Sequence, residues 1–144
     1  MDKKKETRSF RAHLDSLEEI RDFLSSSAKS AGLDNKKTYK IKLAIDEIAT
    51  NIINYGYGEA VDNNDDIELT IVTDNTSFTV ILEDRAAFFD PFHKDLPGEK
   101  ELSTPLEERA IGGLGIMLAK ENVDSFTYEY VNGKNRNIFS MSLD

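Results

Sequence analysis

The sequence contains no cysteine, and only two histidines stand among its 144 residues. Without cysteine the chain can form no disulfide, no thiolate zinc site and no cysteine nucleophile. His13 and His93 lie far apart in the sequence, so a histidine-rich metal site is not expected. Any catalysis must therefore use carboxylates, hydroxyls or a bound cofactor.

Long apolar runs are missing as well. No segment approaches the roughly 18 apolar residues that a membrane-spanning helix needs. The basic residues Lys3, Lys4 and Lys5 are followed by polar residues, whereas a signal peptide continues into an apolar segment. We expect no membrane association and a cytoplasmic location.

Positive charge is scarce. The 18 Lys and Arg residues are outnumbered by 27 Asp and Glu residues, and the formal net charge is −9. Such a field repels a phosphate backbone, so we expect no direct nucleic-acid partner. A nucleotide meets the same repulsion unless backbone amides, a helix N-terminus and a divalent cation supply positive potential at short range.

The composition predicts a single folded domain over 1–144. Hydrophobic residues make up 39% of the chain, and no repeat, low-complexity tract or linker divides it. Apolar residues alternate within 10–14, 67–71, 78–82, 123–131 and 137–143, which predicts strands, with a turn at Asn132-Gly133. They recur at helical spacing within 16–31 and from 34 to about 55, and a short helix is expected after the glycines at 112–115.

The boundaries of the two long helices are marked by cap residues. Ser16 with Glu19 predicts a capping box, Gly32 predicts the end of the first helix, and Asp34 predicts the cap of the second. Strands that arrive in adjacent pairs, with helices bunched at one end of the sequence, favour an α+β fold. We expect a two-layer sandwich in which helices cover one face of a mixed or antiparallel sheet.

Residues 85–111 show no hydrophobic period and contain Pro91, Pro97 and Pro105. Loops longer than about 15 residues are uncommon in a compact domain and usually serve as functional lids or remain disordered. We expect this segment to be a mobile lid.

Glu47 and Asn51 are four residues apart in the second predicted helix, so they project from one side of it. Such a pair commonly forms a solvated helix face. The functional alternative is a carboxylate that accepts a proton next to an amide oxygen that ligates a hard cation such as Mg²⁺.

Asp84 ends a predicted strand, and Gly112-Gly113-Leu114-Gly115 precedes a predicted helix. The carboxylate can open a turn, or it can accept a hydrogen bond from an exocyclic amine such as that of adenine. The glycines can form a tight connection, or they can bring backbone amides close to an anion at the positive end of a helix. No Walker A lysine and no strand-borne G-x-G-x-x-G motif is present, which excludes the P-loop and Rossmann alternatives.

Taken in chain order, these features resemble the N, G1 and G2 boxes of the GHKL ATPase superfamily. The boxes correspond to Glu47 with Asn51, Asp84 with the Phe89-Asp90-Pro91 string, and the glycines at 112–115. The chain most resembles the bacterial anti-sigma factor serine/threonine kinases, the switch-protein kinases of that superfamily. The strings 44–57, 112–118, 124–129 and 133–136 carry this likeness, which covers nearly the whole chain.

The resemblance implies a Bergerat ATP-binding fold, in which helices cover one face of a mixed sheet and ATP with Mg²⁺ binds between the helices and the lid. By position, it implies that Asn51 ligates magnesium, that Glu47 orients or deprotonates the attacking hydroxyl, and that Asp84 binds the adenine amino group. The other nucleotide contacts that it implies are Ala86, Arg109, Gly112, Gly113, Leu114 and Gly115.

Ala86 departs from the family pattern, which usually has glycine two residues after the aspartate of the G1 box. If the backbone there needs a conformation that only glycine adopts easily, the methyl group crowds the nucleotide and weakens its binding.

The resemblance implies an anti-sigma factor with protein kinase activity toward a small anti-sigma factor antagonist, together with binding of a sigma factor. Homodimers are typical of this family. The main alternative is a protein-docking module, with or without nucleotide, that has no kinase activity. A further alternative is a stand-alone ATPase in which water replaces the substrate hydroxyl.

Overall fold

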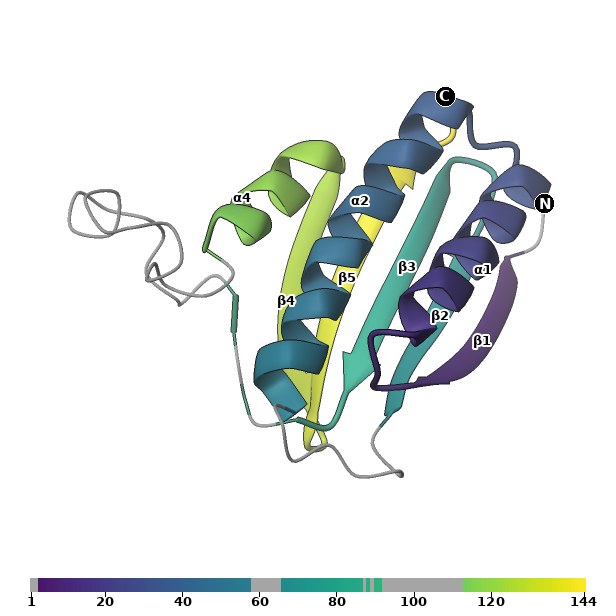
Figure 1. The fold of residues 1–144 in the computed structure, drawn as a ribbon. Coiled ribbons are helices and arrows are strands. Elements are labelled where there is room, and N and C mark those ends of the chain that lie inside the picture. The colour runs from purple at the N-terminus through teal and green to yellow at the C-terminus, as the bar shows by residue number, and fades with distance from the viewer. Residues whose placement is uncertain (1–2, 58–65, 87, 89, 92–112) are drawn as a thin grey trace.

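A five-stranded sheet with helices on one of its faces forms the framework of the chain (Figure 1). The computed structural model describes residues 3–57, 66–86, 88, 90–91 and 113–144. Its strands are β1 (Lys4–Arg11), β2 (Asp66–Thr73), β3 (Ser77–Asp84), β4 (Ser125–Val131) and β5 (Lys134–Ser142). Their order across the sheet is β1-β2-β3-β5-β4. The predicted α+β two-layer architecture is therefore confirmed.

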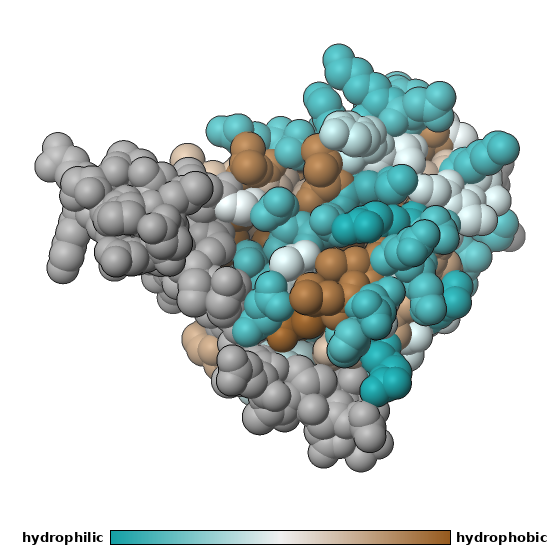
Figure 2. Space-filling model, in the orientation of Figure 1, coloured by the Kyte–Doolittle hydropathy of each residue, from teal (hydrophilic) through white to brown (hydrophobic). Residues whose placement is uncertain are grey.

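Three helices lie on the same face of the sheet (Figure 1). They are α1 (Ser16–Ala31), α2 (Asn35–Asn51), which continues as the π-helical segment η1 (Ile52–Tyr57), and α4 (Gly113–Asn122). Helix α2 lies between the other two and packs against both. No described helix is long and apolar enough to cross a membrane. The surface over the helices is mostly hydrophilic, with hydrophobic side chains in small patches (Figure 2).

The four strand pairings among the described residues are all antiparallel. The family resemblance implied a mixed sheet, and that expectation is wrong for the described strands. Strands β3 and β4 do run in the same direction, because each is antiparallel to β5. The connection through α4 joins two such strands, as a helical crossover normally does. They form no parallel pair because the hairpin β4–β5 places β5 between them.

The core lies between the sheet and the helices, and its residues follow the predicted periods. Strand β5 alternates strictly, with Asn135, Asn137, Phe139 and Met141 buried toward the helices. Phe139 stacks on Phe126 of β4 at a ring-centroid distance of 4.5 Å. Helix α2 contributes the apolar stripe that its 3.6-residue period predicts. The buried members of that stripe are Ile41, Ala44, Ile45, Ile48 and Ala49.

The predicted boundary between α1 and α2 and the predicted range 16–31 of α1 are confirmed, whereas Ser16 as the cap of α1 is wrong. Gly32 ends α1 with φ 84°, in the left-handed region, and Asp34 Oδ1 accepts a hydrogen bond from Lys37 N at 2.8 Å. At the other end Asp15, not Ser16, precedes the first helical residue, and its side chain makes no capping bond. A tight turn in which Ser16 N donates to His13 O sets the helix start one residue earlier than the capping box predicts.

The basic N-terminal segment belongs to the sheet, although only residues 10–14 were predicted as a strand. Strand β1 begins at Lys4, which pairs with Thr73 of β2. Its residues before Phe10 are all exposed, and charged side chains suit an edge strand because they oppose pairing with another chain. Backbone pairing with β2 therefore extends the strand beyond its apolar residues.

The Tyr57 side chain links the helical segment after α2 to the sheet through hydrogen bonds. The predicted helix ends near Tyr55, but η1 extends the helical path to Tyr57. The Tyr57 hydroxyl donates to Asp66 O at 2.9 Å and accepts from Arg85 N at 2.8 Å. It thus connects the end of the helix to the start of β2 and the end of β3.

Replacing Tyr57 with Phe removes both hydrogen bonds of this hydroxyl. We expect Tyr57→Phe to lower the free energy of unfolding by about 1–2 kcal/mol, as measured by urea denaturation. Tyr39→Phe is the matched control, because Tyr39 is 63% exposed and its hydroxyl has no hydrogen bond within the described part of the chain. Equal losses for the two variants would show that Tyr57 does not hold the helix to the sheet.

Candidate functional site

Glu47 lies against helix α4, which its position on α2 does not reveal. Both Glu47 and Asn51 are half-buried, whereas Asn54 farther along is exposed, so the two do not form a simple solvated face. A Cβ atom placed on Gly115 would lie 2.5 Å from Glu47 Oε2. Such a contact is essentially never observed, so any larger residue at 115 must displace the carboxylate. The glycine permits the close approach of Glu47 to the helix.

The glycine motif opens α4 instead of forming a separate loop. Gly113 is the first helical residue and Gly115 lies in the first turn. Gly112 lies outside the described residues, as does the side chain of Leu114. The first turn of a helix carries unpaired amide N–H groups and the positive end of the helix dipole. The structure therefore places the Glu47 carboxylate at a position that also suits an anionic ligand.

Asn51 has a buried amide nitrogen without a hydrogen-bond partner in the described part of the chain. An unpaired buried donor costs about 1–3 kcal/mol, so its presence calls for an explanation such as a ligand. A half-turn of the terminal amide exchanges Nδ2 and Oδ1, which presents an oxygen to the same surroundings. The side chain thus fits a role as a single cation ligand.

Asp84 ends β3 and is only 3% exposed. Its Oδ1 accepts hydrogen bonds from Ala86 N and from Asn135 Nδ2, both at 3.0 Å. Its Oδ2 is buried and has no partner among the described residues. Burial raises the pKa of Asp84, and the hydrogen bonds from Asn135 and Ala86 oppose that shift. One carboxylate oxygen is oriented by the protein, and the other is left as a free acceptor.

Asn135 is a site residue that the sequence motifs did not single out. It is 3% exposed on β5, and its Nδ2 donates to Asp84 Oδ1 and also to Ala86 O at 3.2 Å. The Tyr128 hydroxyl contacts Asn135 Oδ1. This network fixes both the carboxylate and the backbone that follows it. The available signal was the alternation of β5, which puts two asparagines, Asn135 and Asn137, at inward positions normally filled by apolar residues.

Ala86 is accommodated without backbone strain. The residue is buried, and among the described non-glycine residues only Asn132 has a positive φ. Ala86 therefore does not adopt a conformation that requires glycine. Its backbone N–H and carbonyl both belong to the network around Asp84.

Aromatic side chains flank this network. Phe88 makes edge-to-face contacts with Tyr130 at 5.1 Å and with Tyr128 at 6.2 Å, measured between ring centroids. Phe88 is 59% exposed and Tyr130 is 45% exposed. Because Tyr128 also contacts Asn135, this cluster forms an apolar edge beside Asp84, of a kind that suits a planar ring.

The described part of the chain has three buried side-chain polar atoms without partners, and all lie on elements of this site. They are Asn51 Nδ2, Asp84 Oδ2 and Asn137 Oδ1. No group of three His, Asp or Glu side chains forms a metal site within the same residues. Mg²⁺ in nucleotide sites takes few protein ligands and completes its coordination with phosphates and water, so a site with Asn51 as its single protein ligand is compatible with this finding. Arg109 lies outside the described residues.

The comparisons with known proteins concern the family and the fold of the chain. A family described as histidine kinase-like ATPase domain matches residues 10–143. Among solved structures, the chain is similar to that of the RsbU and RsbW domains of Rv1364c from Mycobacterium tuberculosis, with a TM-score of 0.62 and 14% sequence identity. The match covers 96% of this chain but 32% of that one, and it shows the fold alone. No match was found among curated proteins.

The contact between Glu47 and Gly115 predicts that one substitution has different effects in two backgrounds. In the natural chain, Gly115→Ala should stabilise the protein less than alanine normally stabilises a helix, because the methyl group must displace Glu47 Oε2. In a Glu47→Ala background the same change should raise the free energy of unfolding by the full amount, because alanine favours a helix over glycine. We expect a coupling energy of about 1 kcal/mol or more from urea denaturation of the four proteins. Additive effects would show that the two residues do not meet.

The burial of Asp84 predicts a pH-dependent stability difference. Because its pKa is raised above the ordinary value of 3.8, its contribution to stability is fully present below that pH and is lost as the pH rises through the raised pKa. Asp84→Asn cannot ionise, so its free energy of unfolding relative to the natural chain should rise over that pH range. Urea denaturation at a series of pH values measures the difference. If the stability of Asp84→Asn relative to the natural chain stayed constant or fell as the pH rises, the raised pKa of Asp84 would be contradicted.

Proposed function

The chain belongs to the histidine kinase-like ATPase domain family, and from this membership we propose that it is an ATP- and Mg²⁺-dependent protein kinase. Its substrate is a Ser or Thr hydroxyl on a small anti-sigma factor antagonist. It also binds a sigma factor, so that phosphorylation of the antagonist decides which partner the protein holds. The observation that carries the proposal is the position of Glu47 at the first turn of α4.

The unpaired polar groups of the site support the proposal that the chain binds a nucleotide. Asp84 Oδ2 is a buried acceptor of the kind that an adenine amino group satisfies. Phe88 and its aromatic neighbours supply an apolar edge beside it. At the phosphate end, the first turn of α4 supplies amide N–H groups. The phosphate contacts in this proposal are Arg109, Gly112, Gly113, Leu114 and Gly115.

Asn51 would hold magnesium through its amide oxygen. When bound with the nucleotide, the cation neutralises charge on the phosphate oxygens. Phosphoryl transfer requires mainly positioning and electrostatic stabilisation, so one protein ligand for the metal is compatible with it. Ala86 is compatible with nucleotide binding because its backbone is unstrained.

Glu47 is the proposed base. It lies one helical turn before Asn51 and against Gly115, so a hydroxyl that approaches the phosphates at α4 meets its carboxylate. The half-buried position keeps the carboxylate in place while leaving it accessible to a partner protein. The substrate hydroxyl comes from the antagonist.

A docking module without kinase activity is the second candidate. The observation that favours it is the same carboxylate, because Glu47 beside the first turn of α4 also stabilises the helix end as a fixed negative charge. In that case the arrangement of Glu47 is structural, and the protein acts by binding its partner alone.

Two substitutions distinguish the roles of the polar pair. We expect Glu47→Gln to retain Mg²⁺-dependent ATP binding in calorimetry and to reduce phosphate transfer to the antagonist by about 10²–10⁴-fold. Asn51→Ala should lose the magnesium-dependent part of ATP binding.

Transfer of radiolabelled phosphate from ATP to the antagonist measures the reaction. Normal transfer by Glu47→Gln would show that this residue is not the base. Binding of ATP by the natural chain without label on any antagonist would favour the docking module. Release of phosphate without a partner would indicate an ATPase.

A further inference from the structure

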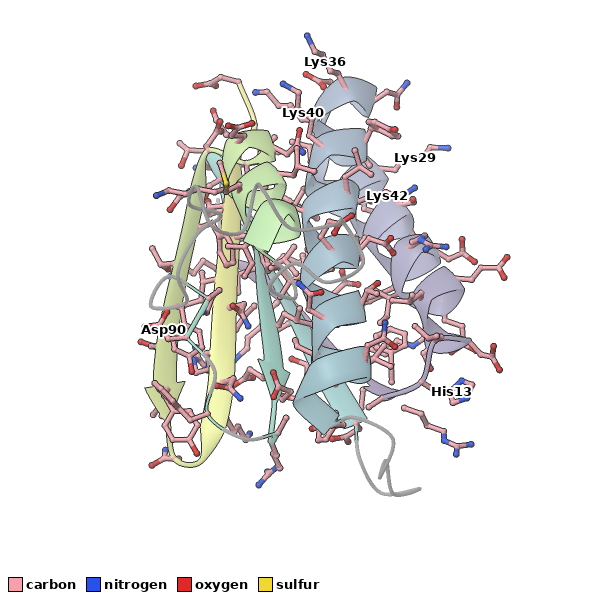
Figure 3. All side chains as sticks on the ribbon, turned by 60° about the vertical axis from the view of Figure 1, so that its left-hand side comes forward. His13, Lys29, Lys36, Lys40, Lys42 and Asp90 are labelled. Carbon is pink, nitrogen blue, oxygen red and sulfur yellow. The ribbon has the colours of Figure 1, made fainter. Side chains whose placement is uncertain are left out.

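Positive charge is concentrated at one end of the helical layer. The segment 29–42 carries five lysines and one aspartate, so its net charge is +4, whereas the whole chain has −9 and the remainder therefore −13. Figure 3 shows Lys36, Lys40 and Lys42 on the first half of α2 and Lys29 near the end of α1. Such an asymmetry in an acidic protein indicates an electrostatically selected surface.

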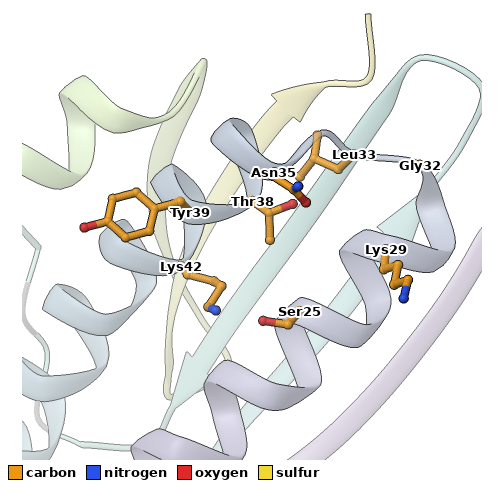
Figure 4. A pocket seen from close by; sticks show the side chains of 8 residues that line it. All are labelled: Ser25, Lys29, Gly32, Leu33, Asn35, Thr38, Tyr39 and Lys42. Atoms are coloured by element: carbon orange, nitrogen blue, oxygen red, sulfur yellow. The ribbon is translucent and has the colours of Figure 1, made fainter.

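Within this segment, α1 and α2 enclose an open groove of about 630 Å³. Lys42 and Thr38 of α2 and Ser25 of α1 point into the gap between the two helices (Figure 4). The buried Leu33 lines the groove where the chain passes from one helix to the other. The lining combines apolar surface with hydroxyl, amide and lysine side chains.

The groove lysines are not used by the fold. Within the described residues, neither Lys29 nor Lys42 has a carboxylate within 4.0 Å, although Lys42 is half-buried. Asp46, one turn after Lys42, is engaged with Arg21 at 2.8 Å. Because neither lysine is neutralised by a carboxylate within the described residues, both are available to pair with the carboxylates of a ligand.

The groove and the candidate site involve different neighbours of α2. Lys42 precedes Glu47 by five residues and Asn51 by nine, which corresponds to about 7.5 and 13.5 Å along a helix axis. The groove involves α1 and the start of α2, whereas the Glu47 contact involves α4. Occupation of the groove does not require nucleotide.

We propose that this groove, lined by Ser25, Lys29, Asn35, Thr38 and Lys42, docks an acidic segment of a partner protein. The lysines supply charge complementarity to Asp and Glu side chains, and the Ser25 hydroxyl and the Asn35 amide donate hydrogen bonds to them, whereas the Thr38 hydroxyl already donates to Asp34 O at 2.8 Å. Lys36 and Lys40 extend the positive surface beyond the groove, so several carboxylates of one segment are accommodated. Tyr39 also borders the groove and is 63% exposed, but its ring points away from the gap between the two helices (Figure 4). A single small anion would use only part of this surface.

A fluorescent oligoglutamate peptide serves as the probe, and its anisotropy with the full chain measures binding at low salt. We expect Lys42→Glu to weaken binding about tenfold or more, because the reversal both removes an attraction and adds a repulsion. Lys134→Glu is the matched control, because it changes the net charge equally in the β4–β5 hairpin, away from the groove, and should have less than about a twofold effect. Backbone amide shifts of the labelled chain should change at 25–42 upon addition of peptide.

Three other outcomes would each contradict the proposal that an acidic segment of a partner docks in the groove. Equal weakening by the two variants would mean that the peptide responds to net charge only. Displacement of the peptide by inorganic phosphate, but not by chloride at equal ionic strength, would indicate a small-anion site instead. Dimerisation of the natural chain in light scattering that Lys42→Glu abolishes would show that a second copy occupies the groove. None of these results depends on whether the chain binds ATP.

Discussion

The close approach of α2 to α4 is the constraint on which the candidate site depends. It places the Glu47 carboxylate where a side chain at 115 would begin, so glycine at 115 permits this carboxylate position by contact and not through a left-handed backbone. The same approach brings a carboxylate from the centre of the fold to the N-terminal end of a second helix. The electrostatic potential at the first turn of α4 is set by the Glu47 carboxylate, by the amide N–H groups of that turn and by any ligand bound there.

The site departs from what stability alone would select. Asn51, Asp84 and Asn137 each keep a buried polar atom without a partner in the described part of the chain, and burial raises the pKa of Asp84. Elsewhere the inner face of the sheet is filled by apolar side chains. Unpaired polar groups confined to one region of an otherwise well-packed core are typical of a binding site, because a ligand supplies the missing hydrogen bonds.

Local patterns predicted the elements well, and contacts between distant segments accounted for the errors. The apolar stripe of α2, the Asp34 cap and the Gly32 and Asn132-Gly133 turns depend on neighbouring residues, so the sequence sufficed for them. The early start of β1 depends on pairing with β2, which lies more than 50 residues away. Asn135 was missed for the same reason, since its partner is Asp84 on another strand. The motif residues Glu47 and Gly115 were predicted, but their contact was not.

The central claim is that remote segments form one site for ATP and magnesium. A crystal structure of the chain grown with Mg²⁺ and a non-hydrolysable ATP analogue tests it most directly. The account predicts the adenine amino group within hydrogen-bond distance of Asp84 Oδ2, the metal on Asn51 and the phosphates at the first turn of α4. Nucleotide density elsewhere, or Asp84 Oδ2 still without a partner in the occupied protein, would contradict it.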